Sequence, residues 1–412
     1  MRRALAYLTM LLGGAAIGLG IVELSLRVAP NGLLPCFNKS AGVWQMHPLF
    51  GWFHVPSSTG WGQVCLSPRR YEWRIVNRIN SNGLNDRERN YEKAPGTFRI
   101  LVLGDSFTEA AQLPIEDGFV SRLERKLATR AGSSRRYEVL NTGVSAWSTD
   151  NELLFFRHEG IRYAPDLVLL AITPGNDIGE NVSALGRPFF RNGGKPTFTL
   201  EEDGRLLLHD FPGPAARRRG WLASAEDVLW RRTRTYPLLL HVVGRSGPEW
   251  LQAGPAPAAD ANRAPPDAGR PRAIPPILGF ALDPLPPDWA RAWELTKALV
   301  RDLRGEVERS GSRFAATIVP SKFEVGGSPS WLPIPKGLDV SFEREDERVE
   351  AFLTAEGIPT CPLLPALRAH LAETGRSGYF IWDVHWTSEG HAVVADAIGE
   401  CLDRLGLLGE HR

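Results

Sequence analysis

Short, uninterrupted apolar runs alternate along most of the chain with longer segments in which apolar positions recur every three or four residues. The mainly apolar runs at 99–103, 166–172 and 313–320 and the short strand-like run at 137–140 each predict a β-strand. Helical spacing follows at 116–128, 289–310, 342–356, 362–373 and from about 390 to 407. Strands that alternate with helices predict a mainly parallel central sheet with helices on both faces, a three-layer α/β/α sandwich. Ligands bind such sheets at the carboxyl ends of the strands.

The N-terminus carries a different pattern. Arg2 and Arg3 are followed by residues 4–22, none of which is charged. As a helix this stretch is about 28 Å long, close to the hydrocarbon thickness of a bilayer. Paired arginines before an apolar span keep its start in the cytoplasm. We therefore expect a transmembrane anchor over residues 1–28, with the rest of the chain on the periplasmic or extracellular side. A cleaved signal peptide is the alternative, with 18–20 as a candidate cleavage site.

Two other segments lack the regular strand–helix pattern. Residues 29–97 are rich in Trp, Gly and Pro, and we expect them to form a membrane-proximal extension with a strand near 71–79. Residues 181–289 are predicted to form an insertion, with a β-hairpin over 197–208. Its 252–288 stretch is loaded with Pro and Ala, a composition that predicts a poorly ordered loop or linker. The insertion is either a lid or substrate platform, or a tolerated surface loop.

Composition narrows the function classes only slightly. The chain has 412 residues, enough for one large core with additions, and its 48 basic and 47 acidic side chains give no sign of nucleic-acid binding. The 4 cysteines allow disulfides in an exported chain. Cys36 with Cys65 is one candidate pair, and Cys361 with Cys401 is the other. Four free, buried thiols are the alternative, and no spacing suggests a zinc site.

Ser106 is the first candidate for chemistry. It lies in the sequence Gly-Asp-Ser-Phe-Thr, directly after the apolar run 99–103 and before a predicted helix. A serine at such a strand-to-helix turn exposes its hydroxyl beside backbone N–H groups, where an acyl-transfer nucleophile is useful. The alternative is a tight turn that caps a helix.

The candidate base is His385, because Asp383 precedes it by two residues. A serine hydroxyl needs a base within hydrogen-bonding reach, and a carboxylate can orient the imidazole and stabilise its charged form. The alternative is a surface-loop histidine with an incidental neighbour. Two further motifs follow strand-like runs: Asn-Thr-Gly-Val-Ser at 141–145 and Pro-Gly-Asn-Asp at 174–177. Each of these, taken alone, is an ordinary turn.

The four motifs in this order resemble the SGNH hydrolases, also called the GDSL esterase family. The family's Ser, Gly, Asn and His fall on Ser106, Gly143, Asn176 and His385. The resemblance implies a flavodoxin-like hydrolase domain over 98–180 and 290–412, separated by the insertion. It also implies an oxyanion hole formed by the backbone N–H groups of Ser106 and Gly143 and the side-chain amide of Asn176. It implies no metal or organic cofactor.

One departure bears on the substrate. Many family members place the Asp three residues before the His, whereas Asp383 precedes His385 by two. This spacing, followed by Trp-Thr, resembles the envelope branch that includes alginate and other polysaccharide O-acetyltransferases. We expect a membrane-anchored serine ester hydrolase that acts on O-acetyl esters of an envelope glycan. Trp147 and Trp386 flank two of the motifs and are candidates to stack on sugar rings, although core packing is the commoner role.

Two other functions remain open. A polysaccharide O-acetyltransferase would use the same triad, and because the chain has a single candidate span it would need a separate acyl-donor partner. A non-catalytic glycan-binding or assembly protein could keep the fold without the reaction. In all three cases the ligand is a glycan or small-molecule ester, and no nucleic acid is involved.

Overall fold

A computed structural model describes residues 2–28, 39–41, 43–67, 70–129, 135–182, 185, 195–209, 229, 233–236, 239, 276–326, 334 and 337–409. The chain forms two compact units. The first consists of residues 1–42, 60–76 and 217–265, and the second of residues 43–59, 77–216 and 266–412. The second unit contains all the residues that the sequence marks as candidates for chemistry.

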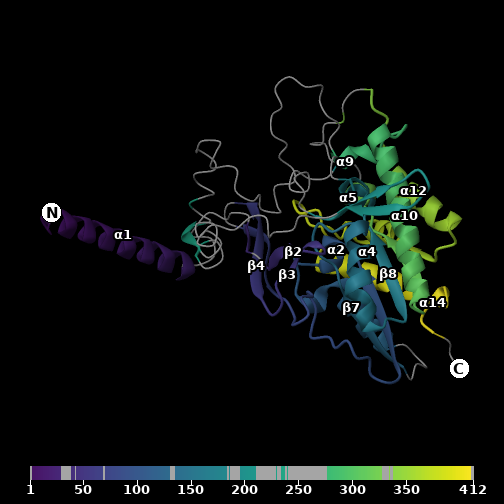
Figure 1. Ribbon diagram of the computed structural model, residues 1–412, viewed down its shortest axis with the longest axis horizontal. Helices are drawn as coiled ribbons and strands as arrows, with labels where there is room; N and C mark the ends of the chain where they lie inside the picture. The colour runs from purple at the N-terminus through teal and green to yellow at the C-terminus, as the bar shows by residue number, and fades with distance from the viewer. Residues whose placement is uncertain are drawn as a thin grey trace. The chain divides into compact units, whose positions relative to one another are not determined.

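A five-stranded parallel sheet forms the centre of the second unit (Figure 1). Its strands, in spatial order, are β12 (Thr360–Pro362), β11 (Arg313–Ile318), β8 (Leu167–Ile172), β6 (Thr97–Leu103) and β7 (Arg136–Asn141). Every residue of β6 and β8 is buried, because both faces of the sheet are covered. The continuous apolar runs in the sequence follow from this two-sided burial.

Helices cover both faces of this sheet. On one face lie α3 (Phe119–Ala128), α13 (Leu364–Thr374) and α14 (Ser388–Arg404), whose apolar side chains share a core cluster with Ile100 and Val102 of β6. On the other face lie α4 (Thr149–His158), α10 (Pro287–Arg309) and α12 (Glu343–Ala355), which pack with Leu101 and Leu103. Successive residues of a strand point to opposite faces, so one apolar strand supplies both cores. The predicted three-layer α/β/α fold is confirmed.

Several smaller elements belong to the same unit. They are β2 (Trp44–His47), β3 (Gly51–His54), α2 (Ser106–Glu109), η1 (Ile115–Asp117), η2 (Gly160–Tyr163), α5 (Pro174–Glu180), β9 (Thr197–Leu200), β10 (Leu206–His209), α9 (Pro276–Gly279) and α11 (Lys322–Gly326). Strands β9 and β10 pair antiparallel, which confirms the predicted hairpin. The predicted 29–97 extension is divided, because residues 43–59 and 77–97 belong to this unit. Most of the Pro/Ala-rich stretch lies outside the described residues.

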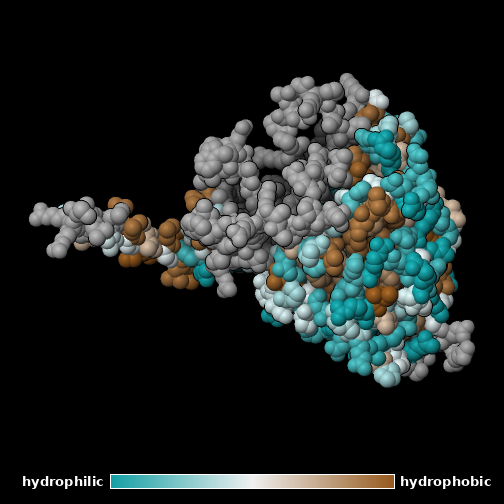
Figure 2. Space-filling view, viewed as in Figure 1, coloured by the Kyte–Doolittle hydropathy of each residue, from teal (hydrophilic) through white to brown (hydrophobic). Residues whose placement is uncertain are grey.

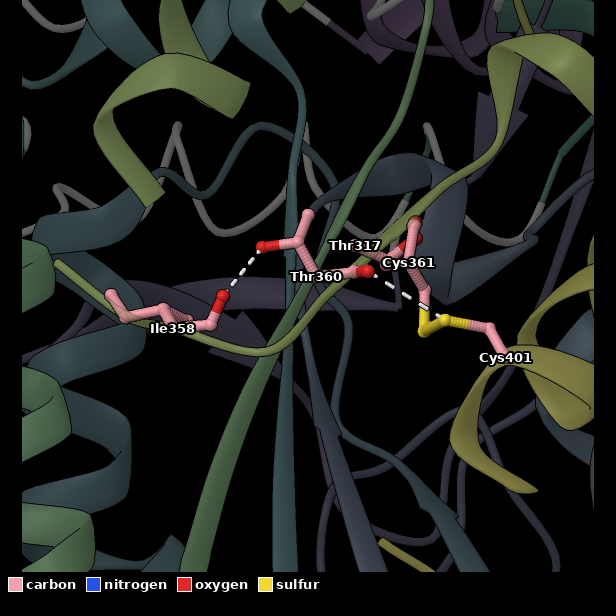
Figure 3. Close-up of a disulfide and its surroundings, with 5 residues drawn as sticks. All are labelled: Thr317, Ile358, Thr360, Cys361 and Cys401. Carbon is pink, nitrogen blue, oxygen red and sulfur yellow. Dashed lines mark hydrogen bonds between the residues drawn. A yellow bond between two sulfur atoms is a disulfide. The ribbon is translucent and has the colours of Figure 1, made fainter. Parts of the chain in front are cut away.

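A disulfide ties the edge of the sheet to the C-terminal helix. Cys361 in β12 is bonded to Cys401 in α14 (Figure 3). The Thr317 hydroxyl on the neighbouring strand donates to the Cys361 carbonyl across 2.6 Å. Cys65 is also disulfide-bonded, and its expected partner Cys36 lies outside the described residues. Disulfides are typical of proteins that fold in oxidising compartments.

The first unit contains α1 (Arg2–Val28), β1 (Lys39–Ala41), and most of β4 (Thr59–Ser67) and β5 (Arg70–Arg78), which form a sheet in the order β1-β4-β5. Within α1, Thr9–Val28 is long and apolar enough to cross a membrane, and a signal sequence has the same properties. Figure 2 shows hydrophobic residues along this helix. The large apolar side chains Met10, Leu11 and Ile17 are all more than half exposed, and an apolar environment would cover them.

Candidate active site

Ser106 begins helix α2 at the point where β6 ends. Asp105 caps this helix and accepts a hydrogen bond from the Phe107 N–H across 2.9 Å. A Cβ on Gly104 would lie 2.2 Å from the Thr108 hydroxyl oxygen, so only glycine allows the strand to turn this sharply into the helix. The Ser106 N–H is one of the first N–H groups of a helix, and no acceptor faces it within the described chain. Ser106 thus combines a partly exposed hydroxyl with an unused backbone donor.

His385 lies in a tight turn between Tyr379 and Trp386, which pair as an antiparallel bridge. The Phe380 N–H donates to the His385 carbonyl across 3.0 Å and closes the turn. The His385 Nε2 atom lies 2.7 Å from the Ser106 Oγ atom. These residues are 279 positions apart in the sequence. The fold brings the end of β6 together with the 379–386 turn, which precedes α14.

Asp383 contacts the other ring nitrogen of His385. Its Oδ1 atom is hydrogen-bonded to His385 Nδ1 and also accepts the His385 backbone N–H across 3.0 Å. A carboxylate that accepts an N–H two residues later forms an Asx turn. The two-residue spacing therefore lets Asp383 fix both the backbone and the ring of His385. Because a carboxylate accepts the Nδ1 proton, the Nε2 lone pair faces the Ser106 hydroxyl and can take its proton.

Gln112 is a neighbour of this turn that the sequence analysis did not identify. Its side-chain nitrogen Nε2 lies 3.0 Å from His385 Nδ1, and its Oε1 atom is buried without a partner within the described chain. When Nδ1 carries a proton, an amide oxygen fits beside it better than an amide nitrogen. With its amide turned over, the Gln112 oxygen would be a second acceptor, beside Asp383, for the N–H at His385 Nδ1. Nothing in its sequence context marks this role.

Asn176 lies in the first turn of α5, where β8 ends. Its side-chain nitrogen donates to the Asp105 Oδ2 atom across 2.9 Å. The primary amide has two hydrogens, so one remains after this bond. The structure thus joins Asn176 to the residue that precedes Ser106.

Gly143 is not available as an oxyanion donor in this structure, contrary to the expectation from the motif. Its N–H already donates to the Asn141 side-chain oxygen across 3.0 Å. A Cβ on Gly143 would lie 2.4 Å from the Glu109 nitrogen, so the glycine allows the chain to pack against α2. Ala146, three residues later, is a half-buried residue with a φ of 64°, and its N–H meets no acceptor among the residues described. Its N–H replaces that of Gly143 as the candidate.

The part of the chain that carries the candidate base matches a known family. Residues 285–411 match the family model described as an SGNH hydrolase-like domain, acetyltransferase AlgX. This range contains the turn with Asp383 and His385, which the contacts above join to Ser106. Over these residues the chain is similar to the SGNH hydrolase family. It is an enzyme that acts on ester bonds, as a hydrolase or as an acyltransferase.

Solved structures show similarity at low sequence identity. A lipolytic protein of the G-D-S-L family from Desulfitobacterium hafniense DCB-2 is 9% identical, with 74% of this chain and 99% of that chain covered and a TM-score of 0.36. The acetyl xylan esterase AlAXEase is 11% identical, with 74% and 100% covered and a TM-score of 0.38. The acetylxylan esterase Axe2 from Geobacillus stearothermophilus is 11% identical, with 74% and 94% covered and a TM-score of 0.38. No curated protein matches the sequence.

Trp147 and Trp386 do not form a sugar-binding surface. Both side chains have an exposed fraction of 0%. Trp147 packs against Phe53 and Trp386 against Phe107, so the core-packing interpretation of both tryptophans holds. Each tryptophan is buried in a different core of the folded protein. Its position beside a motif in the sequence does not show that it is buried.

Trp382 has an exposed aromatic side chain near the site. It is 59% exposed, and its neighbours Ile381 and Val384 are 69% and 38% exposed. The Lys322 ammonium group lies 3.2 Å from the Ile381 carbonyl oxygen and 3.3 Å from that of Asp383, and so holds the backbone on both sides of the tryptophan. The turn that carries the candidate base therefore presents an apolar surface to solvent. Exposure distinguishes Trp382 from Trp147 and Trp386 only once the fold is known.

Buried carboxyl groups lie behind the Ser106 turn. Asp105, Glu152 and Asp177 are almost completely buried. Burial raises the pKa of Asp105, and burial together with neighbouring carboxyls raises the pKa values of Glu152 and Asp177 well above their ordinary range. A higher pKa favours the neutral form of each carboxyl group, and a neutral carboxyl group adds no negative charge beside a developing oxyanion. In the part of the chain that the structure describes, no group of three or more His, Cys, Asp or Glu side chains is arranged to hold a metal ion.

His391 lies in the first turn of α14 and has a role separate from that of His385. Its Nδ1 atom accepts the Phe119 N–H across 3.1 Å, and its ring stacks on that of Phe119. Burial, followed by the nearby His385 and Arg122, lowers the pKa of His391 to about 3. His391 is therefore neutral at ordinary pH and joins α3 to α14, whereas His385 is the histidine that faces Ser106.

Proposed function

We propose that the protein is a membrane-anchored serine ester hydrolase with Ser106, His385 and Asp383 as its catalytic triad. The observation that carries the proposal is the 2.7 Å contact between Ser106 Oγ and His385 Nε2, together with the bond from His385 Nδ1 to Asp383. A nucleophile, a base and a group that orients the base are the three parts that acyl transfer requires. The catalytic domain would comprise 98–180 and 290–412.

The reaction follows from these contacts. The Ser106 oxygen attacks the ester carbonyl while His385 Nε2 takes the hydroxyl proton, and Asp383 stabilises the imidazolium. The tetrahedral intermediate then breaks its bond to the alcohol, which leaves with the proton from His385. Water, deprotonated by His385, attacks the acyl group on Ser106 and releases the carboxylic acid. Ser106 regains its proton and the enzyme is unchanged.

The negative oxygen of the intermediate needs donors that are already in place. Three groups are suitable: the Ser106 N–H, the second amide hydrogen of Asn176 and the Ala146 N–H. The Val144 N–H donates to the Gly104 carbonyl across 3.2 Å, which places the turn that carries Ala146 alongside the start of the Ser106 motif.

The substrate we propose is an O-acetyl ester of an envelope glycan. The description of the matching family as an acetyltransferase supports the acetyl group. The disulfide between Cys361 and Cys401 and the apolar α1 support a catalytic unit outside the cytoplasm, on the periplasmic or extracellular side. The exposed Trp382 beside His385 supports a sugar ring, because sugars bind to flat aromatic faces.

An O-acetyltransferase is the second candidate, and the same family description favours it. The acyl group on Ser106 would then pass to a sugar hydroxyl in place of water, with His385 as the base. A separate donor protein or donor molecule would supply the acetyl group. Free acetate as the product indicates the hydrolase, and acetylated glycan indicates the transferase.

The test uses the full chain in detergent, with p-nitrophenyl acetate and butyrate as substrates. Ser106→Ala and His385→Ala should each abolish turnover without unfolding the protein. Ser310→Ala and His158→Ala are the matched controls, because both residues lie at the opposite end of the sheet and should leave turnover unchanged. Turnover that survives Ser106→Ala would overturn the mechanism. A folded parent without turnover on any ester or acceptor would favour a binding role.

A further inference from the structure

The peptide unit between Ser145 and Ala146 is held by a side chain from the N-terminal part of the second unit. The indole Nε1 of Trp52, in β3, donates to the Ser145 carbonyl across 2.9 Å. Trp52 is only 6% exposed, so water competes little for this bond. Its own carbonyl accepts the Trp147 indole N–H across 3.1 Å, which fixes Trp52 on the other side of the same turn.

The Ser145 N–H is held as well. It donates to the Oε2 atom of Glu109, the last residue of α2. The other carboxyl oxygen of Glu109 lies 3.0 Å from His54 Nε2, and His54 Nδ1 lies 2.9 Å from the Gly83 carbonyl. His54 and Glu109 are 0% and 1% exposed. Both backbone polar groups of Ser145 therefore have buried side-chain partners.

Trp52 and His54 act from one face of β3, because residues two apart in a strand point the same way. One reaches the carbonyl of Ser145, and the other reaches its N–H through Glu109. Two neighbouring positions on one strand thus hold the same residue of the turn.

Because the peptide unit is planar, the direction of the Ser145 carbonyl also sets the direction of the Ala146 N–H. In a trans peptide the C=O and the N–H point in opposite directions, and the bond between Ser145 and Ala146 is trans. When Trp52 fixes the Ser145 carbonyl, it also directs the Ala146 N–H away from Trp52. That N–H meets no acceptor in the described chain. Ala146 also has a φ of 64°, a conformation that costs a non-glycine residue about 1 kcal/mol and persists where the surroundings determine it.

We propose that Trp52, with the Glu109–His54 pair, positions the Ala146 N–H as a donor to the oxyanion. This inference rests on the proposed serine-esterase function. These are positioning residues, because they act through the backbone of Ser145 and Ala146. The strand β3, which lies well before the Ser106 motif in the sequence, is thereby part of the catalytic apparatus.

The test compares Trp52→Phe with Trp44→Phe in the full chain. Trp52→Phe keeps an aromatic ring but removes the N–H that holds the Ser145 carbonyl. Trp44, in β2, is the matched control because its indole N–H is buried and has no partner within the described chain. A donor to an oxyanion is worth about 10²–10³ in kcat, so loss of its orientation should lower kcat by about tenfold or more in Trp52→Phe. KM should change little, and Trp44→Phe should keep the parent kcat.

A second measurement separates positioning from a general loss of structure. A trifluoromethyl ketone forms a tetrahedral adduct with the serine, and its affinity should fall with kcat in Trp52→Phe. Glu109→Gln should produce the same pattern, and it provides an independent test if Trp52→Phe does not fold. Unchanged kcat and ketone affinity in both variants would overturn this inference while Ser106→Ala still abolished turnover. Turnover that persists in Ser106→Ala would overturn the esterase proposal and this inference together.

Discussion

Asn176 donates its side-chain amide to the Asp105 carboxyl group across 2.9 Å, and this bond joins the ends of the neighbouring strands β8 and β6 beside Ser106. The bond fixes the amide plane, and with it the direction of the second amide hydrogen. It also offsets part of the effect of burial, which raises the pKa of Asp105. The residue before the candidate nucleophile therefore orients a candidate oxyanion donor.

Asn176→Ala should lower kcat for p-nitrophenyl acetate by about 10²–10³, because it removes one oxyanion donor. KM should change far less. Asn181→Ala is the control, since Asn181 is also a buried asparagine but donates to Thr296 instead. Steady-state kinetics on both variants check the prediction, and equal losses of kcat in the two would contradict it.

Trp382→Ala should weaken binding of an acetylated oligosaccharide and leave turnover of p-nitrophenyl acetate unchanged. An aromatic contact is worth about 0.5–1.5 kcal/mol, so KM for the oligosaccharide should rise by roughly twofold to tenfold. Ile161→Ala is the control, because Ile161 is an exposed apolar residue on η2, away from the 379–386 turn. An unchanged KM for several acetylated glycans would exclude Trp382 from substrate binding.

Gly143→Ala should destabilise the protein, because the new Cβ would lie 2.4 Å from the Glu109 nitrogen. Overpacking of this kind costs about 1–3 kcal/mol. Gly305→Ala in α10 should instead raise the free energy of unfolding by up to about 1 kcal/mol, because its Cβ would meet only the end of the Arg309 side chain. Chemical denaturation of both variants measures the two effects. A stable Gly143→Ala variant would show that the turn relaxes easily.

The sequence predicts the parts of this protein that depend on local pattern. Strand β8 is a continuous apolar run and β6 ends in one, at 100–103. Ser106 could be placed at a strand end because that position follows from the run before it. Helix α4 was not predicted, because Leu153 to Phe156 are four consecutive apolar residues without helical periodicity. They are buried on all sides, so no polar face reveals the helix.

Within the site, prediction failed where a role depends on contacts between distant segments. Gly143 fits the motif, but the side chain of Asn141 takes its N–H. Trp147 and Trp386 lie beside motifs, yet both are buried, whereas Trp382 is exposed. Trp52 contacts Ser145 across 93 positions, and no local pattern links the two.

Replacing both Cys361 and Cys401 with serine should lower the free energy of unfolding. The disulfide closes a loop with a sequence separation of 40, and the chain-entropy model assigns such a loop about 4 kcal/mol. Turnover at low temperature should persist, because the bond lies at the β12 edge of the sheet. Denaturation with and without a reducing agent checks this prediction: reductant should destabilise the parent by more than it destabilises the double variant.

Glu152→Gln should change how stability depends on pH. Burial, followed by the charges of Asp105 and Asp150, raises the pKa of Glu152 well above its ordinary value, and Lys195 opposes the shift. The folded protein therefore binds this proton more tightly than the unfolded chain does. The resulting stability is fully present below the unfolded pKa of about 4.5 and is lost as the pH rises toward the folded pKa. The loss can reach about 1.4 kcal/mol per pH unit for one proton.

Glutamine keeps the shape of Glu152 and has no proton to lose. The variant should therefore lose less stability than the parent between about pH 5 and about pH 8. Glu373→Gln, at the exposed end of α13, is the matched control and should follow the parent curve. Denaturation midpoints at several pH values measure the difference. Parallel curves for Glu152→Gln and the parent would mean that Glu152 ionises in the folded protein as it does in the unfolded chain, and that the carboxyl groups behind Ser106 carry charge at neutral pH.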